Sequence, residues 1–227
     1  MTKRSKRYQA ALKLVDSAKT YKIGEALELV KKTSNTKFDA SVEVHVKLGI
    51  NPKQSDQIVR SAVVLPAGTG KKIIIAAFVT SAKEKEAKGA GATVVGGEEL
   101  IKEIKKNEKI NFDVAVAEPA MMKHLAMIAK ILGTKGKMPS PKTGTVTPDV
   151  AKTIKEIAGG KVEIKNDESG NIHQIIGKVS FETVKLEENY KALLSAVKSA
   201  KPKGAKQDYI MSVHLCSSMG PSLKVSA

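Results

Sequence analysis

The chain has 227 residues, with 39 Lys and Arg against 23 Asp and Glu, which gives a formal net charge of +16 at pH 7. Its 41% hydrophobic content supports a buried core and excludes intrinsic disorder, while a single cysteine excludes a disulfide framework and favours a reducing compartment. The longest apolar run is too short to cross a membrane, and the basic N-terminus lacks the apolar segment of a secretory signal. These features predict a cytoplasmic protein whose partner carries phosphates, with an unrelated basic enzyme as the alternative.

The first third of the chain predicts two helices followed by a strand. Apolar residues recur at helical spacing over residues 5–16 and again from Ile23 to Val30. From Ser41 to Leu48, apolar and polar residues alternate strictly, which predicts a strand with one buried and one solvated face. A short apolar run at 63–65 follows and ends in a glycine-containing turn.

The middle third alternates between the two element types, and this pattern favours a parallel, doubly wound α/β unit. Ile73–Val79 is apolar throughout, as is typical of a strand covered on both faces. A last helix of this unit is predicted after Thr147, with Pro148 at its first position. The other predicted strands are 93–95 and 112–117, and the other helices 82–88, 98–106 and 121–132.

The last third predicts strands at 162–164, 172–179 and 209–215 and a helix over 186–197. Neither outer segment has enough strands for a stable sheet alone, whereas the two together do. We therefore expect a split domain, into which the α/β unit is inserted through Gly68–Gly70 and Gly159–Gly160.

The sequence contains no recognisable catalytic constellation. A phosphate loop at Gly70-Lys71 would need glycine at the position of Leu65 and a hydroxyl at the position of Lys72. His214 and Cys216 form one weak pair, with no second pair to complete a zinc site. We expect no enzyme activity, no cofactor and no metal. A nucleotide-using enzyme built on the α/β unit and a non-specific DNA-compacting protein are the rival readings.

Four segments carry a family resemblance: residues 38–71, 131–150, 170–181 and 217–225. In these segments, and over nearly the whole chain, the sequence resembles the bacterial form of the large-subunit ribosomal protein one (L-one) family. The resemblance implies an α/β fold class. A discontinuous α+β terminal domain, a two-layer sandwich, would comprise residues 1–67 and 161–227, and an inserted Rossmann-like three-layer domain would comprise residues 68–160.

The resemblance also implies a function and its partners. The protein would bind 23S rRNA at the mobile stalk of the large ribosomal subunit and take part in the release of tRNA from the exit site. It would also repress translation by binding its own operon mRNA. Outside the ribosome it would be a monomer, with no membrane partner.

The family's RNA-contacting residues can be placed where this sequence matches them. The implied RNA-binding residues are Glu28, Lys37, Phe38, Ser41, Asp167, His173, Ser212, Ser217, Ser218, Met219 and Gly220. In the inserted domain, the basic, glycine-containing loop 130–142 offers Lys135, Lys137 and Lys142 as RNA or tRNA contacts.

Four features depart from the family pattern, one of them the run 133–138, which is more basic at Lys137, and some matched positions have a structural alternative. Ser218 replaces the usual threonine and keeps its hydroxyl, while Cys216 stands where serine or threonine is common. Glu168 replaces a usual lysine, which puts a phosphate contact at that position in doubt. Phe38 could be a core residue, and Met219 could belong to an ordinary turn.

Overall fold

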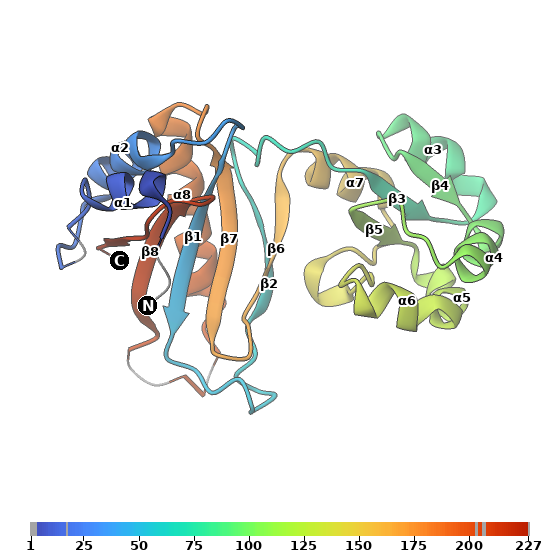
Figure 1. The fold of residues 1–227 in the computed structure, drawn as a ribbon. Helices are drawn as coiled ribbons and strands as arrows, with labels where there is room; N and C mark the ends of the chain where they lie inside the picture. Colours follow the sequence, from blue (N-terminus) through green and yellow to red (C-terminus); the bar gives the residue numbers. More distant parts are fainter. Residues whose placement is uncertain (1–3, 17, 203, 206–207, 227) are drawn as a thin grey trace. The chain divides into compact units, whose positions relative to one another are not determined.

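The computed structural model describes residues 4–16, 18–202, 204–205 and 208–226 (Figure 1). The chain divides into two compact units, which we call unit 1 (residues 1–70 and 162–227) and unit 2 (residues 71–161). Both contain helices and strands, so the mixed α/β class is confirmed. Within the described residues, the helices are too short or too polar to span a membrane.

Unit 1 is built on a four-stranded sheet that combines both ends of the chain. Its strands, in spatial order, are β7 (Asn171–Lys178), β1 (Ser41–Leu48), β8 (Ile210–Ser217) and β9 (Leu223–Val225). Strand β1 pairs antiparallel with both β7 and β8, so the N-terminal segment supplies a central strand between two C-terminal ones. A separate two-stranded sheet joins β2 (Arg60–Val64) and β6 (Lys161–Lys165).

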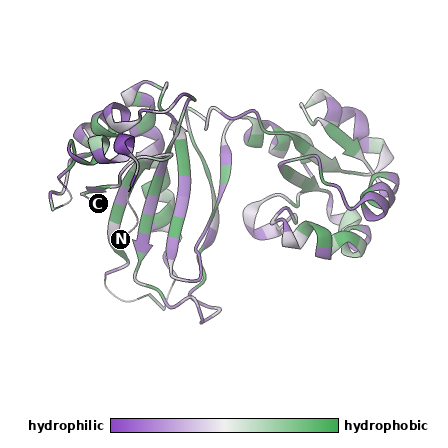
Figure 2. Cartoon of the chain, viewed as in Figure 1, coloured by the Kyte–Doolittle hydropathy of each residue, from purple (hydrophilic) through white to green (hydrophobic). Residues whose placement is uncertain are grey.

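In the described part of the chain, the helices of unit 1 pack on one face of the four-stranded sheet. Helix α2 (Ile23–Thr33) contacts β8 and β9, and α8 (Thr183–Ser199) contacts β7. Val42, Val44 and Val46 point toward these helices and are fully buried, while the residues between them remain half-buried. Figure 2 shows the resulting alternation of hydrophobic and hydrophilic residues along the strands. The predicted two-faced strand at 41–48 is confirmed.

Unit 2 has a parallel sheet with helices on both faces. Strand β3 (Ile75–Phe78) lies between β4 (Val94–Gly96) and β5 (Val114–Ala117), and all four of its residues are buried, as predicted. Its alternate side chains enter two separate hydrophobic clusters, which places one layer of helices on each face of the sheet. One layer contains α4 (Glu98–Asn107), α5 (Met122–Leu125) and α6 (Ala129–Thr134), and the other contains α3 (Glu84–Gly89) and α7 (Val150–Ala158).

Three predicted helices differ from those observed. The first, α1, spans only Lys6–Leu12. The helix expected over 121–132 is interrupted by a 3₁₀ turn at Ala126–Ile128. Helix α7 begins at Val150, so Pro148 precedes it, because the backbone of Thr145 and Thr147 is hydrogen-bonded to Ala117 of β5 and is held extended.

Candidate nucleic-acid interface

The face of the four-stranded sheet opposite the helices presents a row of polar side chains, which we call the open face. Strand register places Lys47 between Asn171 and Ser212, and His45 between His173 and His214. The other residues of the open face are those that are paired with these residues in neighbouring strands or that alternate with buried residues along each strand. The open face comprises Ser41, Glu43, His45 and Lys47 of β1, Asn171, His173, Ile175 and Lys178 of β7, Ser212, His214 and Cys216 of β8, and Lys224 of β9.

Three histidines cross the middle of the open face. His45 and His173 approach each other with their Nδ1 atoms 2.7 Å apart, so one nitrogen donates and the other accepts. Burial lowers the pKa of His45, with a further contribution from His173, and burial followed by Lys224 lowers the pKa of His214. Both shifts disfavour the charged imidazolium of His45 and His214, while Lys47, Lys178 and Lys224 place ammonium groups on this face.

Several residues expected to bind RNA meet at one end of the open face. The backbone N–H of Ser218 donates to the carbonyl of Ser41 over 2.9 Å, which joins the turn after β8 to the start of β1. Phe38 lies just before this strand, and its side chain is 57% exposed, so the alternative of a core role is wrong. The neighbouring Lys37 is exposed as well.

The turn after β8 holds a methionine out into solvent at some conformational cost. Met219 has a φ of +65°, which is unusual for a residue other than glycine, and its side chain is 70% exposed. A Cβ on Gly220 would lie 2.3 Å from Oγ of Ser217, so a larger residue at this position would force the Ser217 side chain to move. An exposed apolar side chain gains little from the fold, so packing within unit 1 does not explain this strained conformation.

At the other end of the open face, Asp167 organises the loop between β6 and β7. Its carboxylate accepts hydrogen bonds from the backbone N–H groups of Ser169 and Asn171, at 2.9 and 2.7 Å. Chiefly because of the Asn171 N–H, the pKa of Asp167 lies well below its ordinary range. The carboxylate also faces Nε2 of His173 at 3.3 Å, so Asp167 positions a residue of the open face. Ser212 lies toward this end, opposite Lys47.

Two residues expected at the interface lie elsewhere in unit 1. Ser217 is 1% exposed and, being paired with Val42, belongs to the helix-covered face, so it cannot offer its hydroxyl to a ligand on the open face. Glu28 is exposed on α2, in the helical layer behind the sheet.

The three lysines expected in unit 2 have different surroundings. Lys135 and Lys142 are exposed. Lys137 is half-buried: its ammonium donates to the backbone carbonyl of Phe112 and lies 5.8 Å from the centre of that ring. Lys137 therefore contributes to the packing of unit 2.

The residue list drawn from the resemblance lacks several members of the open face. His45 and Lys47 share the strand parity of Ser41, so the alternation of β1 was a signal that could have identified them. Cys216, which was considered from the sequence only as a weak pair with His214, contacts His45, with Sγ 3.1 Å from Nε2. This pairing depends on the register between β1 and β8, which the sequence pattern does not give.

Unit 2 has a pocket at the carboxyl ends of β3 and β4, where nucleotides bind in many doubly wound folds. Four glutamates contribute to its lining: Glu84, Glu98, Glu99 and Glu103. Carboxylates in this number repel phosphate, and two of them already occupy the first turn of α4. The pocket therefore disfavours the reading of the chain as a nucleotide-using enzyme.

Comparison with known proteins gives one consistent result. The model of the ribosomal protein L1p/L10e family matches residues 30–221. The chain is 53% identical over 227 residues to large ribosomal subunit protein uL1 of Mycoplasma capricolum subsp. capricolum, with 99% of each chain covered. It is 51% identical over 227 residues to uL1 of Mesoplasma florum, again with 99% of each chain covered. It is 49% identical over 225 residues to uL1 of Kosmotoga olearia, covering 99% of this chain and 97% of the relative.

Proposed function

The chain belongs to the ribosomal protein L1p/L10e family, and on that premise we propose that it is a structural protein of the large ribosomal subunit that binds 23S rRNA through the open face of unit 1. The observation that supports this most strongly is the exposure of Phe38 and Met219 beside a lysine-bearing open face, in a chain of net charge +16. Proteins of the large subunit are cytoplasmic, and no catalytic role is needed.

The open face suits structured RNA better than duplex DNA. A flat strand surface with hydroxyls, imidazoles and lysines can follow the shallow minor groove of A-form RNA and contact its 2′-hydroxyl groups. Lys47, Lys178 and Lys224 supply charge for phosphates, while Phe38 offers a ring on which an unstacked base can stack. Non-specific binding to duplex DNA depends mainly on charge, so the ring of Phe38 and the polar side chains of the open face favour the RNA assignment.

The finer roles follow from family membership and are part of this proposal. The stalk helices of 23S rRNA are the main RNA site that we assign to the chain. We also assign to it a contribution to tRNA release from the exit site and repression of translation through its own operon mRNA. The exposed Lys135 and Lys142 of unit 2 are the side chains we assign to tRNA or further RNA contact. Outside the ribosome we expect a monomer.

A chemical footprint on 23S rRNA tests the RNA-binding assignment. The full-length protein is added to the RNA, and backbone protection is compared with that of the variant Phe38→Ala. We expect one compact protected region in the stalk helices, with its strongest protection reduced in the variant. Protection scattered over the RNA, or an identical pattern with the variant, would contradict the assignment.

A further inference from the structure

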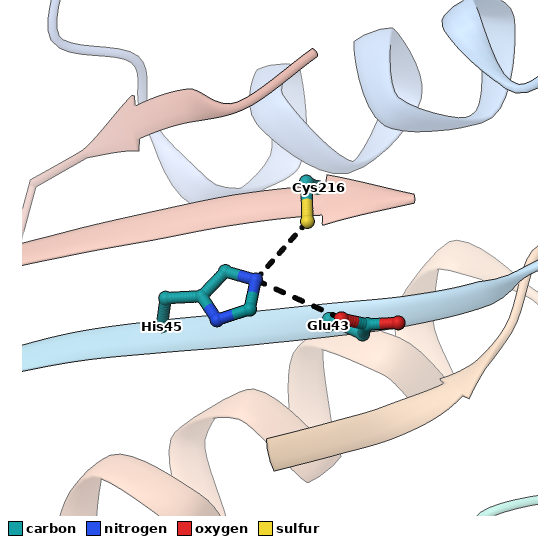
Figure 3. Close-up of side chains that lie close together, drawn as sticks. All are labelled: Glu43, His45 and Cys216. Atoms are coloured by element: carbon teal, nitrogen blue, oxygen red, sulfur yellow. Dashed lines mark hydrogen bonds and ion pairs between the residues drawn. The ribbon is translucent and has the colours of Figure 1, made fainter. Parts of the chain in front are cut away.

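Three side chains able to bind a metal ion converge on the open face (Figure 3). Nε2 of His45 lies 3.1 Å from Sγ of Cys216 and 3.8 Å from a carboxylate oxygen of Glu43. The three potential ligand atoms all lie within 4.8 Å of one another, and each residue is half-buried. The cluster combines a thiol, an imidazole and a carboxylate, so it is more than an acidic patch.

The sheet itself assembles this cluster. Glu43 and His45 are two residues apart in β1 and therefore point to the same face. The antiparallel register places Cys216 of β8 directly opposite Glu43, with His214 opposite His45. Because both strands are central in the sheet and paired on each side, the ligands sit on a rigid support.

The two distances from Nε2 of His45 are close to those expected around a tetrahedral ion. With bonds of about 2.0–2.3 Å, the ligand atoms around Zn²⁺ lie about 3.4–3.6 Å apart, between the two measured distances. Sulfur and nitrogen ligands favour Zn²⁺ over Mg²⁺ and Ca²⁺, which prefer oxygen atoms alone. Three protein ligands would leave the fourth position for water.

The surroundings hold two of the ligands in the orientation that binding needs. Nδ1 of His45 lies 2.7 Å from Nδ1 of His173, whose Nε2 in turn lies 3.3 Å from Asp167. If each imidazole donates along this chain toward the carboxylate, Nε2 of His45 keeps its lone pair and faces Cys216. Metal-bound histidines usually have such a partner on their second nitrogen. The hydroxyl of Ser218 similarly donates to one oxygen of Glu43 over 3.2 Å and leaves the other oxygen for an ion.

We propose that Glu43, His45 and Cys216 form a binding site for one Zn²⁺ ion on the open face of unit 1, with His173 and Asp167 as positioning residues. Binding replaces the thiol proton of Cys216 by the metal, and that proton passes to solvent. The proposal does not rest on the RNA-binding function, because the site exists in the free protein.

Metal titration of the untagged, full-length protein in the absence of RNA tests the site. Zn²⁺ affinity is measured by competition with a chromophoric chelator, and Co²⁺ serves as the spectroscopic probe. We expect one equivalent of each, and a tetrahedral Co²⁺ spectrum with a thiolate-to-metal band. No saturable binding, or an octahedral Co²⁺ spectrum without the sulfur band, would overturn the proposal.

Variants separate this cluster from the other side chains of the open face. Cys216→Ser removes the sulfur at nearly constant volume, and we expect it to abolish the thiolate band and weaken Zn²⁺ binding at least tenfold. Glu43→Gln should also weaken binding, and His173→Gln should do so about 10- to 100-fold through the orientation of His45. His214→Gln is the matched control and should leave affinity within about twofold of the wild type. Circular dichroism verifies folding of each variant. A site that survives Cys216→Ser and Glu43→Gln but is lost in His214→Gln would refute the assignment of ligands.

Discussion

The open face of unit 1 and the strand-end pocket of unit 2 carry opposite charges, although both belong to a chain of net charge +16. Lys47, Lys178 and Lys224 lie on the open face, whereas four glutamates line the pocket. The excess of lysine therefore does not mark every concave or flat surface as a site for phosphates. The comparison teaches that net charge suggests a class of partner, while the placement of charge on particular elements shows where that partner can bind.

Matched lysine pairs give the largest expected contrast between the two units. The double variant Lys37→Gln/Lys224→Gln removes two exposed charges at or beside the open face, and Lys135→Gln/Lys142→Gln removes two exposed charges from unit 2. We expect the first pair to weaken 23S rRNA binding at least tenfold and to lower the salt dependence by about 0.7–0.9 per lysine lost. The second pair should change affinity less than threefold. Equal losses for the two pairs would remove the distinction between the units.

Ser218 tests a single hydroxyl at the end of the open face. Its Oγ is only partly buried and donates to Glu43. Loss of a hydrogen bond to RNA costs about 1–3 kcal/mol, so Ser218→Val should weaken RNA binding about tenfold with little change in melting temperature. Ser218→Thr, which keeps the hydroxyl, should be nearly neutral. If Ser218→Val lowers stability and affinity together, the hydroxyl serves the turn rather than the RNA.

Glu118 tests whether a carboxylate at the strand ends of unit 2 has a structural role. Lys83 is 3.0 Å away and Thr80 donates to the carboxylate over 2.9 Å; the hydrogen bond from Lys83 is the main cause of a lowered pKa of Glu118. Because this pKa is lowered in the folded state, the ionised carboxylate of Glu118 stabilises the fold above pH 4.5, the ordinary pKa. This stabilisation is lost as the pH falls through the lowered pKa. Glu118→Gln should therefore lower the melting temperature at pH 7 by about 2–4 °C.

Thermal unfolding at several pH values measures this effect. The difference between the wild type and Glu118→Gln should shrink as the pH falls below 4.5 and through the lowered pKa of Glu118. A constant difference over this range would show that the ion pair is not its cause.

The smallest expected effect is a null one. Because Glu84, Glu98, Glu99 and Glu103 repel phosphate, ATP or GTP at millimolar concentration should leave the melting temperature of the chain unchanged. If either nucleotide raised the melting temperature, and substitutions in the pocket abolished that increase, the hypothesis that unit 2 is a nucleotide-using enzyme would be supported again.

The local sequence patterns predicted individual helices and strands well, but they did not predict which residues these elements bring into contact. The alternation at 41–48 gave the strand and its solvated face, because burial on one side of a sheet imposes a period of two. Over 121–132 the buried side chains keep helical spacing, yet the hydrogen bonds tighten into a 3₁₀ turn at Ala126–Ile128. Apolar residues at helical spacing therefore predict which side of a segment is buried, but they do not predict whether its backbone forms α-helical or 3₁₀ hydrogen bonds.

The candidate site was predicted in part. Family resemblance supplied Phe38 and Met219, and the structure exposes both. The contact between His45 and Cys216, which are 171 residues apart, depends on strand register and could not be derived from local sequence. Ser217 shows the reverse case: its neighbours in sequence are half-buried, while strand parity buries its own side chain completely.

The central claim, that the open face and its adjoining loop bind RNA, is tested most directly by one pair of variants. Phe38 and Val184 are exposed to similar extents, 57% and 66%, but Val184 lies on α8 in the helical layer. Affinity for a 23S rRNA fragment that contains the stalk helices is measured for Phe38→Ala and Val184→Ala. Loss of one stacked base costs about 1–3 kcal/mol, so Phe38→Ala should weaken binding about 5- to 150-fold, and Val184→Ala should not weaken it. Equal affinities for the two variants would contradict the claim.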